Sequence, residues 1–155
     1  MARAPYQVLV IPFDDTADLR VAVLRRADMD AWQFVAGGGE EGETPLAAAR
    51  REAMEEIGAG GELYPLDSCC SVPASVIRRE ARSHWPARTL EIPEYAFALR
   101  VQADGLTLSH EHSSAVWASP EEAARLLRYD SNRTALAELT ERIHRGWLER
   151  AADIP

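Results

Sequence analysis

Apolar residues along the chain come in short runs or alternate with polar residues, a pattern that predicts β-strands. Residues 6–13 (YQVLVIPF) form a buried strand in this interpretation, and Pro12 within it favours a sheet edge or a bulge. Residues 19–26 (LRVAVLRR) alternate, and residues 32–36 (WQFVA) predict a strand that leads into a glycine-rich loop. Three further strands are predicted, over residues 62–72 with an interruption at Pro65, over residues 94–101 and over residues 114–118.

A helix is predicted over residues 45–57, where its start and its end both carry recognisable signals. Thr44 is a good N-cap, Pro45 suits the first helical position, and Gly58 supplies a stop. Two more helices are predicted near the end of the chain, over residues 120–128 and over residues 134–148, the latter from apolar residues at helical spacing, Leu136, Leu139, Ile143 and Trp147.

This order of strands and helices is typical of an α+β or α/β fold, here in one domain over residues 1–155. The 155 residues are 46% hydrophobic, which is enough for one proper core. Residues 73–93 are rich in arginine and lack a clear period, so we expect a loop or an extended hairpin near the functional site.

The formal net charge of -8 argues against nucleic acid or an anionic membrane as a general partner. An acidic protein can still bind a small polyphosphate when metal ions mediate the contact. No apolar run is long enough to span a bilayer, and the first residues lack the layout of a signal peptide. We therefore expect a cytoplasmic protein.

Three carboxylates, Glu52, Glu55 and Glu56, share one face of the helix predicted over residues 45–57. Glu52 and Glu56 are like charges one turn apart, and negative charge in the last turn opposes the helix dipole. A divalent cation would remove this repulsion, which indicates a metal site. The alternative is a solvated charged face interleaved with Arg50 and Arg51, as most charge runs are.

The segment from Gly37 to Ala59 resembles the Nudix box, GX5EX7REUXEEXGU, in which U is a bulky aliphatic residue. Gly37 is followed after five residues by Glu43, and after seven more by the sequence REAMEEIGA. Every invariant position is met, and the departures are Ala53 and Ala59 at two U positions. The resemblance implies an αβα sandwich, a mixed sheet between helices, and hydrolysis of a diphosphate linkage.

The resemblance also implies roles for individual residues. Glu52 and Glu56 are implied to bind Mg²⁺, for which Mn²⁺ can substitute, and Glu55 to assist or to bind a further ion. The carbonyl group of Gly37 is implied to complete the metal site. The remaining two box residues, Glu43 and Arg51, resemble the pair that ties the loop to the helix and positions the ligands.

A general base is expected within reach of the attacking water. The segment Ser109–His112, just before the last predicted strand, supplies a candidate in Glu111, which also matches a metal-binding glutamate outside the box in the resembling enzymes. The alternative is an ordinary polar turn. We expect His110 and His112 to be polar loop residues rather than ligands, because Mg²⁺ prefers oxygen.

Substrate recognition needs surfaces that stack on a ring and cations that neutralise phosphates. We expect Trp32, Phe34 and Tyr129 to supply the stacking surfaces, and Arg3 and Arg25 to supply the cations. The alternative for the aromatic residues is a place in the core, which is more common for aromatic residues on strands. The stretches WQFVAGGGEEGET and VWASPEEAARLL resemble dihydroneopterin triphosphate pyrophosphatases. Ala36 and Tyr129 depart from that subgroup, which affects the pterin specificity rather than the catalytic residues.

Other functions stay open at this point. The substrate is a nucleotide or pterin polyphosphate in our interpretation, and ADP-ribose, a dinucleoside polyphosphate or a nucleoside triphosphate are alternatives. A second alternative is a non-catalytic nucleotide-binding Nudix sensor, although erosion of the box carboxylates is expected there and all of them are present. The oligomeric state is open as well, with a homodimer among the options.

Overall fold

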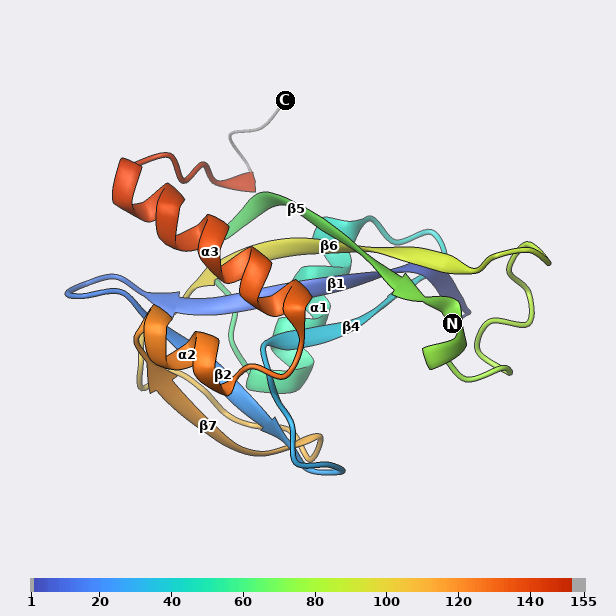
Figure 1. The fold of residues 1–155 in the computed structure, drawn as a ribbon, viewed down its shortest axis with the longest axis horizontal. Helices are drawn as coiled ribbons and strands as arrows, with labels where there is room; N and C mark the ends of the chain where they lie inside the picture. Colours follow the sequence, from blue (N-terminus) through green and yellow to red (C-terminus); the bar gives the residue numbers. More distant parts are fainter. Residues whose placement is uncertain (1, 152–155) are drawn as a thin grey trace.

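The computed structural model describes residues 2–151, and all strands in this part of the chain join one mixed sheet (Figure 1). The strands are β1 (Arg3–Asp14), β2 (Arg20–Arg26), β3 (Trp32–Gln33), β4 (Val35–Glu40), β5 (Leu63–Pro73), β6 (Glu91–Arg100) and β7 (His112–Ala118). Strand β1 is central, because it pairs in parallel with β6 and antiparallel with β2 and β4. Strand β5 pairs with β6, while β3 and β7 pair with β2.

Helices cover both faces of this sheet. Helix α1 (Pro45–Ile57) lies behind the sheet in Figure 1, and helices α2 (Pro120–Leu126) and α3 (Asp130–Arg145) lie in front of it. Alternation along β1 sends Val8 and Val10 toward α1, and Leu9 and Ile11 toward α2 and α3. The predicted αβα sandwich is confirmed. Within residues 2–151, no helix has the length and apolar composition needed to cross a bilayer.

Helix α1 has the predicted bounds and caps. The Thr44 hydroxyl oxygen accepts a hydrogen bond from the amide of Ala47 at 3.2 Å. The helix ends at Ile57, and Gly58 takes the left-handed conformation with φ of 63°. Because the caps and the apolar stripe agree, the helix forms where the local sequence indicates.

Pro12 does not mark a sheet edge or a bulge, so that expectation is wrong. It lies inside β1, paired with Leu99 of β6. On the other side of β1, pairing with β4 ends at Val10 and pairing with β2 begins at Phe13. Pro12 therefore falls between two antiparallel ladders, where a missing amide donor is tolerated.

The glycine run is strand rather than loop, which is a second correction. Gly37 and Gly38 belong to β4 and pair with Val8 and Gln7 of β1. This strand has few side chains of its own, and it remains ordered because side chains of neighbouring elements cover the glycines. Only residues 41–44 connect β4 to α1.

The end of the last helix differs from the prediction, whereas residues 73–93 form the expected loop, here between the paired strands β5 and β6. Helix α3 ends at Arg145, so Trp147 lies beyond it with 58% of its surface exposed. Residues 73–93 begin with a short 3₁₀ helix, η1 (Ala74–Val76), and return through turns to β6. Trp85 in this segment is buried in a small cluster of its own with Ala74 and Ile92.

Candidate active site

Arg51 of α1 organises the acidic side chains around it. Its Nε and Nη2 atoms donate to both carboxylate oxygens of Glu43, at 2.9 and 3.0 Å. Nη2 also donates to the carbonyl of Gly38 at 2.9 Å, and Nη1 donates to Glu52 at 2.9 Å and to Glu55 at 3.2 Å. One guanidinium therefore joins β4, the connecting loop and α1, which only the planar arginine fork can do.

Glu43 is held from the loop side as well. Its Oε1 accepts the amide of Glu40 at 3.0 Å, and its own carbonyl accepts the Tyr6 hydroxyl at 2.7 Å. The bidentate contact with Arg51 lowers the pKa of Glu43 below its ordinary value. The loop is thus fixed by ionised groups at neutral pH.

Glu52 lies directly against the backbone of β4. A Cβ atom added to Gly37 would lie 2.1 Å from the carboxyl carbon of Glu52, so no residue larger than glycine fits there without displacing that carboxylate. Glu52 is buried, and burial together with the negative charge of Glu56 raises its pKa. This carboxylate is held in place with little water around it.

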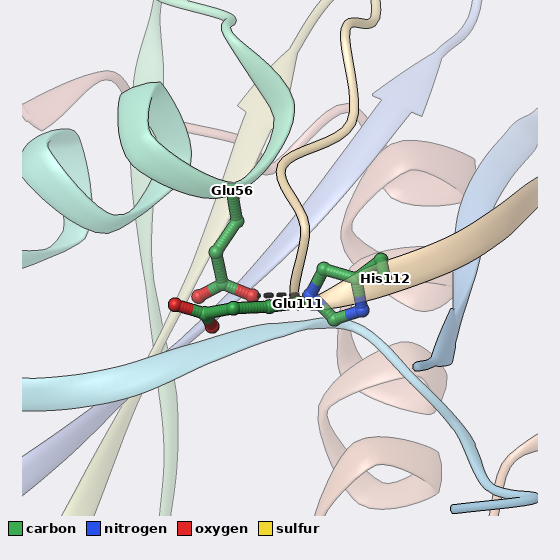
Figure 2. A group of neighbouring side chains, drawn as sticks. All are labelled: Glu56, Glu111 and His112. Atoms are coloured by element: carbon green, nitrogen blue, oxygen red, sulfur yellow. Dashed lines mark hydrogen bonds and ion pairs between the residues drawn. The ribbon is translucent and has the colours of Figure 1, made fainter. Parts of the chain in front are cut away.

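Glu56 is 1% exposed and contacts His112 (Figure 2). The His112 Nε2 atom lies 2.6 Å from Glu56 Oε1, and it is the donor when Glu56 is ionised, because an ionised carboxylate only accepts. Among residues 2–151, Glu56 Oε2 has no hydrogen-bond partner. Burial raises the pKa of Glu56 although the His112 contact opposes that shift.

Glu111 immediately precedes β7 and points its carboxylate toward that of Glu56 (Figure 2). One potential ligand atom from each of Glu56, Glu111 and His112 lies within 4.8 Å of the others. His112 is the first residue of β7 and is buried, so our expectation of a polar loop residue is wrong. Its Nε2 is already bonded to Glu56, which makes it a positioning residue for that carboxylate.

These residues fit a divalent cation. Glu56 Oε2 is a buried carboxylate oxygen without a partner, and Glu52 is a second buried carboxylate nearby. Oxygen donors of this kind are the ligands that Mg²⁺ prefers. Glu55 differs from them, because its side chain is 58% exposed and turned toward Arg51.

A cavity of about 790 Å³ extends from this acidic cluster along the α3 side of the sheet. Gly37, Glu56, Glu111 and His112 line one end. The rest of the wall comes from β1, β2, β3, β5, β6, η1 and the start of α3, and includes Arg3, Gln7, Arg26, Val72, Pro73, Val76, Ile77, Glu94, Tyr129 and Asn132. A cation-binding acidic end joined to a long mixed wall suits a phosphorylated small molecule.

The structure separates the expected substrate-binding residues into two groups. Arg3 and Tyr129 line the cavity. Phe34 is fully buried in the core, so the expectation that it stacks on a substrate is wrong. Trp32 packs against the same core, and Arg25 lies outside the cavity lining and pairs with Asp30 at 3.2 Å.

Several lining residues were missed from the sequence. Arg26, next to Arg25, lines the cavity, and Asn132 is buried at the start of α3 with its Oδ1 accepting the amide of Phe34 at 2.9 Å. Glu94 lies in a predicted strand on the same face as Ala96 and Ala98, so a charged residue on an apolar face was the available signal. Nothing in the local pattern distinguished Arg26 from Arg25.

Comparison with known proteins identifies the family. Residues 4–139 match the NUDIX domain. The chain is 30% identical over 138 residues to dihydroneopterin triphosphate diphosphatase from Escherichia coli (strain K12), over 88% of this chain and 92% of that protein. It superimposes on the structure of the E. coli dihydroneopterin triphosphate pyrophosphohydrolase with a TM-score of 0.71 at 28% identity, covering 88% and 94% of the two chains.

A NUDIX hydrolase structure from Listeria monocytogenes str. 4b F2365 is also similar, with a TM-score of 0.81 at 42% identity, covering 94% of this chain and 99% of that one. The chain belongs to the NUDIX domain family. It is a Nudix hydrolase with pyrophosphohydrolase activity, in a family of enzymes that use divalent metal ions.

Proposed function

We propose that this enzyme hydrolyses a diphosphate bond of dihydroneopterin triphosphate, with Mg²⁺ as its cation and Mn²⁺ as a substitute. The observation that carries this proposal is the pair of buried carboxylates, Glu52 and Glu56, of which Glu56 lines a cavity of about 790 Å³ together with Gly37 and Glu111. The likeness to dihydroneopterin triphosphate diphosphatase over 88% of the chain supports the choice of substrate.

Glu52 and Glu56 would hold the cation, with the carbonyl group of Gly37 beside Glu52 and the carboxylate of Glu111 facing that of Glu56. When bound, Mg²⁺ supplies positive charge that offsets the charge gathered on the phosphates and on the leaving group. His112 fixes the orientation of Glu56, and Arg51 fixes Glu52 and Glu43. Glu55 contributes to the charge around Arg51 in this account rather than to the cavity.

Glu111 serves as the general base in this proposal. Its carboxylate is exposed at the cavity end, within 4.8 Å of the ligand atoms of Glu56 and His112, where a water molecule can reach it. Water attacks a phosphorus atom, the bridging P–O bond breaks, diphosphate leaves, and Glu111 accepts the proton of the water. Arg26 lines the cavity and neutralises the phosphates as they bind.

A substrate panel tests the proposal. The purified protein is assayed with Mg²⁺, with Mn²⁺ and with a chelator against dihydroneopterin triphosphate, the nucleoside triphosphates, ADP-ribose and dinucleoside polyphosphates, and products are identified by mass. We expect metal-dependent release of diphosphate, with dihydroneopterin triphosphate among the best substrates. If only ADP-ribose or only dinucleoside polyphosphates are hydrolysed, that compound becomes the assigned substrate. If no compound in the panel is hydrolysed, the proposal is overturned.

A further inference from the structure

A second polar cluster lines the cavity where β1 and β6 pair. It consists of Arg3 and Gln7 on β1 and Glu94 on β6, which share no segment with the metal-site residues. Arg3 Nη2 donates to Gln7 Oε1 at 3.2 Å, and Gln7 Nε2 donates to Glu94 Oε2 at 2.5 Å. The amide of Gln7 is thereby oriented, with its oxygen toward the cation and its NH₂ group toward the carboxylate.

Glu94 sits in the interior of the sheet, paired with Gln7 of β1 on one side and with Cys70 of β5 on the other. It is 5% exposed, and among residues 2–151 its Oε1 atom has no hydrogen-bond partner. A buried carboxylate oxygen without a donor is costly, and such a group is retained where a ligand supplies the missing contact.

Arg3 lies at the other end of the cluster and has an unpaired donor where Glu94 has an unpaired acceptor. Its Nε atom is buried and has no acceptor within the described part of the chain. A Cβ atom added to Gly38 would lie 2.3 Å from the guanidinium carbon, so the glycine leaves room for this side chain against the sheet. The cavity wall therefore presents an unpaired acceptor and an unpaired donor on either side of Gln7.

We propose that Glu94 and Arg3 read the hydrogen-bonding edge of the substrate ring and select a 2-amino-4-oxopyrimidine edge, which guanine and pterin share. That edge carries an N–H and an NH₂ group side by side, which a carboxylate accepts, followed by a carbonyl oxygen that a guanidinium can bind. Adenine presents a ring nitrogen lone pair beside its NH₂ group and is repelled. This inference deepens the proposed function and rests on the same cavity.

The surrounding wall agrees with a ring at this position. Apolar surface near the cluster comes from Val72 and Pro73 of β5, Val76 of η1 and Ile77 directly after it, and Tyr129 stands at the start of α3. A ring held there leaves its phosphate tail free to extend toward Glu56 and Glu111. Recognition and chemistry thus occupy different ends of one cavity.

Glu94→Gln tests the inference, with Glu91→Gln as the matched control. Glu91 lies on the same strand, is exposed and is absent from the cavity wall. The ratio of kcat/KM for GTP to that for ATP, and for dihydroneopterin triphosphate to that for ATP, is measured with Mg²⁺. We expect both ratios to fall about 10- to 100-fold in Glu94→Gln through KM, since a charge-assisted acceptor becomes a donor, and to stay within twofold in Glu91→Gln.

A wild-type comparison needs no variant to fold. ITP differs from GTP only by the missing 2-amino group, so we expect about tenfold weaker kcat/KM for ITP. Calorimetry of GMP and IMP binding to the metal-free protein makes the same comparison without catalysis. It therefore tests recognition of the ring independently of the proposed hydrolase activity. Equal binding of GMP and IMP, or unchanged ratios in a folded Glu94→Gln protein, would overturn the inference.

Discussion

The two ends of the cavity are built in different ways. At the acidic end, Glu52 and Glu56 come from one helix and Gly37 from the adjoining strand, within a single short segment of the chain. At the ring end, Arg3 and Glu94 come from strands far apart in sequence that meet through the parallel pairing of β1 with β6. The residues of the acidic end can be predicted from their spacing in the sequence. The residues of the ring end come together only when the sheet forms.

The ends also differ in how their buried charge is compensated. Glu52 is bonded to Arg51 and Glu56 to His112, yet burial still raises the pKa of both carboxylates. Within the described part of the chain, Glu94 has only the neutral amide of Gln7. The first end therefore calls for a cation and the second for a neutral donor edge, and each variant below tests whether the two ends act separately.

The largest expected effect is at the acidic end. Glu56→Gln removes a carboxylate that would hold the cation, and we expect kcat to fall about 10³-fold while the protein stays folded, because a neutral amide is easier to bury. Glu55→Gln is the matched comparison, and we expect less than a tenfold loss since Glu55 is exposed. Steady-state phosphate release with thermal unfolding measures both, and an unimpaired Glu56→Gln enzyme would remove Glu56 from the metal site.

Glu111→Gln comes next. Loss of the general base lowers kcat about 10²-fold with little change in the Mg²⁺ concentration needed for half-maximal rate. A parallel weakening of Mg²⁺ dependence would make Glu111 a cation ligand instead. A metal titration that shows neither change would remove Glu111 from the site.

Arg51→Lys tests the scaffold of the acidic end. Lysine cannot keep the bidentate contact with Glu43 together with the contacts to Gly38 and Glu52, so we expect the free energy of unfolding to fall by about 2 kcal/mol. Arg50→Lys on the exposed face of the same helix is the control, with a change within about 0.5 kcal/mol. Urea unfolding of both variants measures the difference, and equal stability would contradict the role of Arg51.

The smallest expected effect is a pH dependence of the metal-free protein. Burial raises the folded-state pKa of Glu52 from the ordinary 4.5 to about 8 and also raises that of Glu56. Their contribution to stability is therefore full below pH 4.5 and is lost as pH rises through these raised values. We expect a loss of about 1–3 kcal/mol over that range, smaller in Glu56→Gln and reversed by Mg²⁺. Glu43, with its lowered pKa, loses its contribution only as pH falls below 4.5. A pH-independent unfolding free energy from pH 5 to 8 would contradict the raised values.

The same contrast explains which parts of the fold and of the site could be predicted from the sequence alone. The bounds of α1 and the pairing of Glu43 with Arg51 followed from caps and from the Nudix resemblance. The burial of Phe34 and the choice of Arg26 over Arg25 depend on which strand face meets the cavity, and local alternation does not settle that. His112 and Glu94 gained their roles from strand pairing and helix packing over long separations.

Kinetics of Glu56→Gln and Glu94→Gln on one substrate, GTP with Mg²⁺, test the central claim that one end performs chemistry and the other reads the ring. We expect Glu56→Gln to lower kcat with KM nearly unchanged, and Glu94→Gln to raise KM with kcat nearly unchanged. The double variant should then show the product of the two effects. Loss of kcat in both variants, or a change of KM in both, would contradict the division of the cavity.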